Sequence, residues 1–240
     1  MPIRNFDKRK QKMKGIVLSV IMLVTTCGMA QDFGEMRLLA WKGDSAAQYN
    51  LAVSFLTGKG VEQDIDSAFY WFAESAEAGV AYAQYNLGLM YQQGRGTLRD
   101  DSRAEIWYLK AAKKGLSEAQ FALGMMYYSG DCGSNTCGFS VPWFQMAAVQ
   151  GHLDAMNMLG NIYLGGEGVI VNYQKALQYY KMAATDGHPE AQFNLGWMYY
   201  YGRGVTKNNE IATMWMKRAS DQGNQKAKIF IQSNRLERYL

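Results

Sequence analysis

The sequence repeats with a period of 36 residues, and this period constrains the fold more than any other feature. Glycine recurs at every 36-residue step from Gly43 to Gly223. Counted from this glycine, alanine always stands at +4, leucine stands at +8 in five copies, and an aromatic residue stands at +12 and at +28 in five copies. A period of this length predicts stacked supersecondary units that share one continuous core.

Each period predicts two helices. Positions +4, +8 and +12 lie on one face of a helix over residues 44–56 in the first copy, and a second helix is predicted over residues 65–78. Four copies also carry glycine at +9, which costs about 1 kcal/mol of helix propensity relative to alanine, so its recurrence predicts a close helix approach. We therefore predict an all-α fold, an α/α superhelical solenoid, in which the recurring Trp, Tyr, Leu and Ala residues form the core.

The segments between the paired helices carry Gly-x-Gly, as in Gly58-Lys59-Gly60 and Gly202-Arg203-Gly204. We expect the first glycine to end the helix in a left-handed conformation and the second to permit another turn with positive φ. A dinucleotide-binding loop would need a third glycine and a preceding strand, and neither is predicted here.

The basic excess of the chain lies at its N-terminus. Six of the 25 basic residues and one of the 21 acidic residues fall in the first thirty, which leaves 19 basic and 20 acidic residues in the remainder. A basic start, an apolar run over residues 16–24 and small residues at Gly28 and Ala30 predict a signal peptide over residues 1–30. An uncleaved anchor and lipidation at Cys27 are the alternatives. The nearly neutral remainder argues against nucleic acid as a partner.

The pattern A-x-x-x-L-G-x-x-Y-x-x-G-x-G-V, followed by A-x-x-W and A-A-x-x-G, resembles the Sel1-like repeat, a relative of the tetratricopeptide repeat. The resemblance extends from Gly43 to about Ile231 and implies a right-handed superhelix that mediates protein–protein interaction, often in bacterial envelope or secreted proteins. With the period, it predicts an N-terminal cap helix over 31–42, five repeats over 43–222 and a C-terminal capping helix over 223–240. Some cysteine-rich relatives carry a penicillin-binding or β-lactamase label, but the disulfide in each of their repeats is absent from this chain.

The third copy breaks the turn pattern, because Cys132 replaces the second glycine and Cys137 follows it. An exported chain meets an oxidising compartment, so we predict a Cys132–Cys137 disulfide that closes this turn. Free thiols and a metal site are the alternatives, although two thiols alone are too few ligands for zinc.

Catalytic motifs are scarce in this sequence. The histidines, His152 and His188, both follow the repeat glycine and are interpreted as solvent-exposed turn residues. The Ser-x-x-Lys motif is absent after residue 30, and Lys-Thr-Gly is absent as well, so the serine β-lactamase mechanism lacks a nucleophile. We therefore predict no catalytic site, no cofactor and no metal. The alternative is a cell-envelope hydrolase or ligand binder of the cysteine-rich Sel1 type.

Binding is the function that the sequence favours. Aromatic residues outside the repeated positions are candidate partner-binding residues, and we select Tyr128, Trp197, Tyr200 and Tyr201. The alternative is that these side chains only fill gaps between turns of the superhelix. We expect a periplasmic or secreted monomer that binds a protein or peptide in its concave groove and touches a membrane only through an uncleaved leader.

Overall fold

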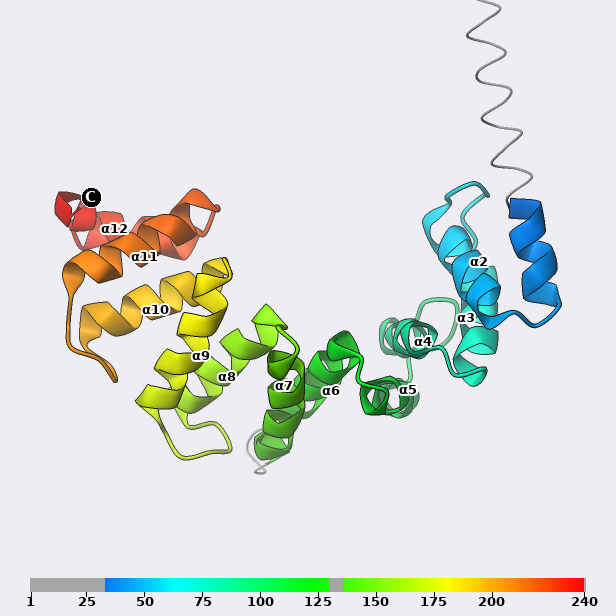
Figure 1. The fold of residues 1–240 in the computed structure, drawn as a ribbon, viewed down its shortest axis with the longest axis horizontal. Coiled ribbons are helices and arrows are strands. Elements are labelled where there is room, and N and C mark those ends of the chain that lie inside the picture. Colours follow the sequence, from blue (N-terminus) through cyan, green and yellow to red (C-terminus); the bar gives the residue numbers. More distant parts are fainter. Residues whose placement is uncertain (1–32, 130–135, 240) are drawn as a thin grey trace, which may run out of the picture. The chain divides into compact units, whose positions relative to one another are not determined.

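The structure is a computed structural model that describes residues 33–129 and 136–239, and these residues form helices and turns without a strand. The first helices of successive repeats begin at 36-residue intervals: α2 (Ser45–Thr57), α4 (Ala81–Gln93), α6 (Ser117–Ser129), α8 (Leu153–Gly165), α10 (Pro189–Tyr201) and α12 (Gln225–Ser233). A helix over residues 33–41 and the second helices alternate with them (Figure 1): α3 (Ile65–Glu77), α5 (Asp101–Lys113), α7 (Ser140–Val149), α9 (Tyr173–Thr185) and α11 (Asn209–Asp221). The predicted α/α solenoid fold is confirmed.

The helices form two compact units, one that ends at Trp107 and one that begins at Tyr108, so the division falls within α5. The core of the N-terminal unit contains Leu51, Phe72 and Leu87. The main core of the C-terminal unit repeats the same positions, with members that include Phe144, Leu159, Tyr180 and Leu195. Both units therefore bury the stripe that the period predicts.

The glycine at +9 brings the two helices of a repeat into close contact, as predicted. A Cβ atom built on Gly160 would lie 2.4 Å from the ring of Tyr180, and one built on Gly124 would lie 2.7 Å from the ring of Phe144. These rings stand at +29, and the side chains at this position are fully buried in all five repeats: Phe72, Tyr108, Phe144, Tyr180 and Met216. The aromatic residue at +28, predicted to be core, is buried in two repeats and half-buried in three. The centre of the core is thus one residue further along the helix than the tryptophan pattern indicates.

The Gly-x-Gly turns have the predicted backbone. Gly58 and Gly202 end their helices with φ of 73° and 67°, and the second glycines, Gly60 and Gly204, have φ of 78° and 67°. Gly204 also needs the absence of a side chain, because a Cβ there would lie 2.8 Å from the backbone of Tyr173 in the preceding repeat. The second glycine therefore serves both the turn and the contact between successive repeats.

The turn of the third repeat differs from the others. A short 3-10 helix, η2 (Thr136–Phe139), precedes α7, which begins at Ser140 with Phe139 as a cap that makes no side-chain hydrogen bond. Cys132 lies outside the described residues, as do Cys27 and the whole predicted leader, so the disulfide and the signal peptide remain predictions. A second 3-10 helix, η3 (Leu236–Tyr239), follows α12 and buries Leu236 in the last small core.

Candidate functional site

An aromatic cluster on α10 unites three of the four predicted partner-binding residues. The ring centroids of Trp197 and Tyr201 lie 4.7 Å apart, and those of Tyr200 and Tyr201 lie 4.9 Å apart. Phe230 on α12 completes the group, with its ring 5.1 Å from that of Tyr200. Because α10 and α12 are both first helices, the cluster links two successive repeats of the C-terminal unit.

The three predicted residues of this cluster differ in the exposure of their side chains. Tyr201 is 51% exposed, whereas Trp197 and Tyr200 are half-buried. The hydroxyl of Tyr200 donates to Asn234 Oδ1 at 3.1 Å, and Lys207 Nζ lies 5.3 Å from the centre of its ring. Tyr200 is therefore held by contacts within the protein, Trp197 packs partly against both cores of the C-terminal unit, and Tyr201 is the most exposed ring of the cluster.

Tyr128 lies apart from this cluster, on α6. Its ring packs 6.4 Å from that of Phe144, and its hydroxyl donates to the carboxylate of Glu167. Burial, together with the hydrogen bond and the negative charge of Glu167, raises the pKa of Tyr128 to about 12. The hydrogen bond to Glu167 joins the third and fourth repeats, and Tyr128 lies on a different helix from the α10 cluster.

A group of asparagines on α8 and α10 was not predicted from the sequence. Asn194 on α10 donates through Nδ2 to Asn157 Oδ1 at 3.0 Å and to Asn161 Oδ1 at 3.4 Å, and both partners lie on α8. Asn161 Oδ1 also accepts from the hydroxyl of Tyr180 at 2.7 Å. The sequence feature that could have indicated this group is that the asparagines occupy variable positions of the repeat. Such positions face the first helices of neighbouring repeats and not the core within a repeat.

The two histidines are helix caps, which corrects their interpretation as solvent-exposed turn residues. The Nδ1 atoms of His152 and His188 accept from the backbone N–H groups of Ala155 and Ala191 at 3.3 and 3.1 Å. His188 also contacts Asp154 through Nε2 at 3.0 Å, and its side chain is only 14% exposed. The position after the repeat glycine is therefore an N-cap, and Asp44 and Asn224 fill it in the same way in other copies.

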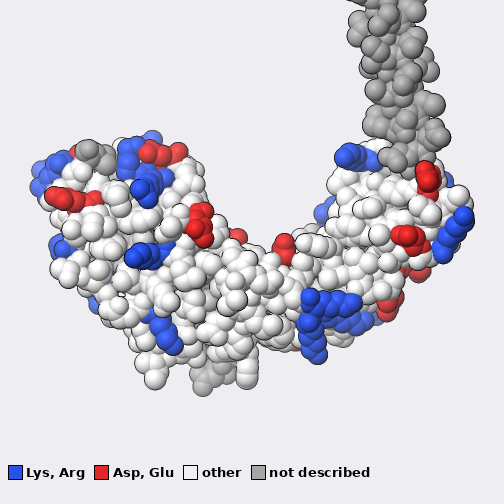
Figure 2. Space-filling view, in the orientation of Figure 1, with Lys and Arg blue, Asp and Glu red and all other residues white. Residues whose placement is uncertain are grey.

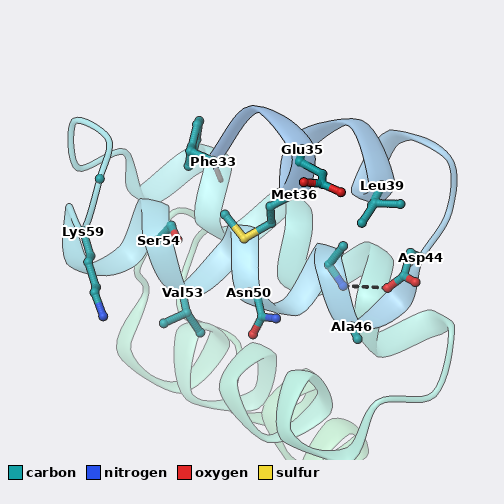
Figure 3. A pocket seen from close by; sticks show the side chains of 12 residues that line it. Phe33, Glu35, Met36, Leu39, Asp44, Ala46, Asn50, Val53, Ser54 and Lys59 are labelled. Atoms are coloured by element: carbon teal, nitrogen blue, oxygen red, sulfur yellow. Dashed lines mark hydrogen bonds between the residues drawn. The ribbon is translucent and has the colours of Figure 1, made fainter. Parts of the chain in front are cut away.

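A groove of about 730 Å³ lies in the N-terminal unit between the helix over 33–41 and α2. Figure 3 shows Met36 between the two helices, with Glu35 and Asp44 toward one end of the groove and Lys59 toward the other. Apolar side chains contribute most of its walls: Phe33, Met36, Leu39 and Val53. This groove was not predicted from the sequence, because residues 31–42 were interpreted as a cap.

The charged side chains, possible metal ligands and helix lengths of the described residues bear on other kinds of site. Figure 2 shows cationic and anionic side chains interspersed, with most of the visible face neither. Residues 33–129 and 136–239 contain no group of three His, Cys, Asp or Glu side chains suited to a metal ion. None of the helices in the described part of the chain is both long and apolar enough to cross a membrane.

Comparison with known proteins identifies the repeat. The model of the Sel1 repeat matches five consecutive segments: residues 45–80, 81–116, 117–152, 153–188 and 189–224. A protective antigen of uropathogenic Escherichia coli strains, c5321, is 32% identical with a TM-score of 0.79, and the match covers 83% of this chain but only 43% of that one. A Sel1 repeat protein from Oxalobacter formigenes is 30% identical with a TM-score of 0.74, over 88% of this chain and 84% of that one. No curated protein matches the chain.

Proposed function

Because the chain belongs to the Sel1 repeat family, we propose that it is an exported scaffold that binds a protein or peptide partner through the first helices of its solenoid. Export is inferred from the basic and apolar leader over residues 1–30, and the proposal includes a location in the periplasm or outside the cell. The repeats then act as a rigid support for residues at variable positions, which select the partner.

The observation that carries this proposal is the aromatic surface formed by Trp197 and Tyr201. A tryptophan and a tyrosine 4.7 Å apart, one of them half exposed, form the kind of anchor that dominates binding energy in protein interfaces. Asn194 lies on the same helix and, with Asn157 and Asn161 of α8, adds polar side chains suited to hydrogen bonds with a partner.

The proposal is tested by affinity capture from envelope extract, followed by calorimetry with the identified partner and purified components. We expect the variant Trp197→Ala with Tyr201→Ala to lose at least about tenfold in affinity, as removal of interface anchors does. Met214→Ala is the matched control, because Met214 is 42% exposed but lies on the second helix α11. Unchanged affinity in the double variant, with the fold intact by circular dichroism, would refute this binding surface.

A separate assay addresses the hydrolase alternative. Purified protein is mixed with a chromogenic β-lactam, and the release of the chromophore is followed over time. The scaffold proposal expects no turnover above that of the buffer, and saturable hydrolysis would overturn it.

A further inference from the structure

The groove between the helix over 33–41 and α2 has the features needed to hold one more helix, of the kind that begins each repeat. We call this helix-binding site the seat. We infer that an α-helix of a partner protein occupies this seat, parallel to α2, with a small residue against Met36 and a cation in its first turn beside Glu35 and Asp44. This inference rests on the proposed binding function and assigns it a second surface, in the N-terminal unit.

In the C-terminal unit, the first helix of one repeat contacts the first helix of the preceding repeat. His188 at +1 contacts Asp154, Asn194 at +7 donates to Asn157, and Asn234 at +11 accepts from Tyr200. Position +3 makes the same kind of contact, since Lys226 Nζ lies 2.6 Å from Glu190 Oε1. A receiving helix therefore uses positions +1, +3, +7 and +11.

Helix α2 presents these four positions to the groove: Asp44, Ala46, Asn50 and Ser54. The same positions touch a preceding first helix in the C-terminal unit, whereas here they line open space of about 730 Å³. Positions +1, +7 and +11 contact positions +3, +6 and +13 of the preceding first helix. Because the contacting positions increase along both helices, the two helices run parallel. A helix seated by the same rules would lie parallel to α2.

The opposite wall of the groove sets the size of the residue that faces it. Met36 stands 36 residues before Phe72, at the +29 position. In the C-terminal unit the +29 ring packs directly on glycine at +9 of a first helix, so closely that a Cβ on Gly124 or Gly160 would lie within 2.7 Å of it. The occupant therefore needs glycine or alanine opposite Met36, because a larger side chain would meet this wall.

The charged residues of the groove determine the direction in which the bound helix runs. Asp44 lies at the end of the groove where α2 begins, Glu35 lies between this end and Met36, and Lys59 lies beyond the C-cap Gly58, at the other end (Figure 3). A helix parallel to α2 brings its positive N-terminal end to the two carboxylates and its negative C-terminal end to the ammonium group. A lysine or arginine in its first turn adds an ion pair with Asp44 or Glu35.

Two segments of this chain fit the seat poorly. Position +9 of α12 is Gln232. If α12 of a second copy occupied the groove, this long polar side chain would press against Met36. One period before the first repeat, position +9 is Ile16, which is also large. The chemistry of the groove therefore favours a helix of another protein.

Helix α8 supplies a probe that satisfies all of these requirements after one substitution. A peptide of residues 153–165 carries Gly160 for Met36 and Asn157 for Asn50, as Asn157 meets Asn194 in the protein. Asp154→Lys in the peptide replaces a carboxylate that Asp44 would repel. The peptide is locked as a helix by a hydrocarbon staple on the face away from Gly160, labelled with a fluorophore and titrated with the full chain by anisotropy.

Two leucines of the helix over 33–41 give a matched pair of variants. Leu39 lines the groove, whereas Leu38 is 54% exposed and does not line it. We expect Leu39→Gln to weaken peptide binding by about tenfold or more, since burial of one leucine side chain is worth at least that factor. Leu38→Gln is expected to bind as the unmodified chain does.

The outcomes separate the groove from the scaffold function. Loss of binding in Leu39→Gln alone, together with loss when the peptide carries Gly160→Leu, supports the seat. Equal binding in both leucine variants, or equal binding of the Gly160→Leu peptide, overturns it. Self-association of the chain in sedimentation velocity that Leu39→Gln abolishes would also overturn it, because a second copy would then be the occupant. Partner capture lost through Trp197 and Tyr201 would still support the scaffold if the peptide failed.

Discussion

The side-chain amide of Gln150 donates a 2.8 Å hydrogen bond to Oε1 of Gln120, a buried residue on α6, the first helix of the same repeat. Gln222 makes the same 2.8 Å bond to Gln192 two repeats later. In both cases the buried glutamine also donates through Nε2 to an alanine carbonyl of the preceding second helix, at 3.2 Å. Each of these buried amides is thus satisfied at both of its ends.

Gln48 is buried at the equivalent position in the first repeat, but its Oε1 has no hydrogen-bond partner. The residue thirty positions later is Ala78, whose φ and ψ of −67° and −8° are close to the −86° and 5° of Gln150. We predict that Ala78→Gln donates to Gln48 and raises the free energy of unfolding by about 1 kcal/mol, the net value of one hydrogen bond. Urea denaturation measures this change.

The control for this substitution is Ala78→Glu, which has a similar shape but cannot donate from its carboxylate. The hydrogen-bond explanation requires that glutamine stabilise the chain and that glutamate fail to do so. An equal gain from both residues would point to helix propensity or packing as the cause.

A second prediction concerns the contact of Gly160 with Tyr180. The ring of Tyr180 is fully buried and its hydroxyl is held by Asn161 at 2.7 Å, so it has little freedom to move away from a new Cβ at 2.4 Å. We expect Gly160→Ala to lower the free energy of unfolding by about 1–3 kcal/mol, the usual cost of overpacking.

Gly34→Ala is the comparison for this overpacking effect. A Cβ on Gly34, in the helix over 33–41, meets nothing within 4 Å. There the better helix propensity of alanine acts alone, and we expect a gain of up to about 1 kcal/mol. Stabilisation by both substitutions would show that the close approach at +9 is not a constraint.

The period was sufficient to predict the helices, the turn glycines and the close approach at +9, because each of these repeats in every copy or nearly every copy. It was not sufficient to identify the central ring of the core. Trp71 and Phe72 are adjacent aromatic residues about 100° apart around the helix, and either could face inward. Only the packed structure shows that Phe72 is fully buried while the tryptophan position varies.

The candidate sites were harder to predict, since they depend on residues that do not repeat. Trp197 and Tyr201 could be selected as departures from the pattern, but the pairing of Asn194 with Asn157 depends on how two first helices face each other. The N-terminal groove exists because no described first helix precedes α2, and a position at the end of an array has no signature in the repeat itself. The cap formed by His188 could have been found by comparing it with Asp44 at the same position.

That cap gives a third prediction. The Nδ1 atom of His188 accepts from Ala191 N–H at 3.1 Å at the start of α10, and Asn224 caps α12 from the same position at 2.9 Å. We expect His188→Ala to lose about 1 kcal/mol of stability and His188→Asn to retain most of it, because asparagine is a good N-cap. Thermal unfolding of the two variants measures the difference, and equal losses would assign the effect to the contact with Asp154 instead.

A fourth prediction follows from the contact of Tyr128 with Glu167, which contributes with burial to a tyrosine pKa of about 12. The folded state holds this proton more tightly than the unfolded chain, in which tyrosine has a pKa of about 10. The stabilisation is therefore fully present below pH 10 and is lost as the pH rises toward 12.

Difference titration of tyrosinate absorbance between the parent chain and Tyr128→Phe isolates this residue. We expect Glu167→Gln to move the transition of Tyr128 to lower pH without restoring the ordinary value, because burial, the larger cause, remains. A transition unchanged by Glu167→Gln would show that burial alone raises the pKa.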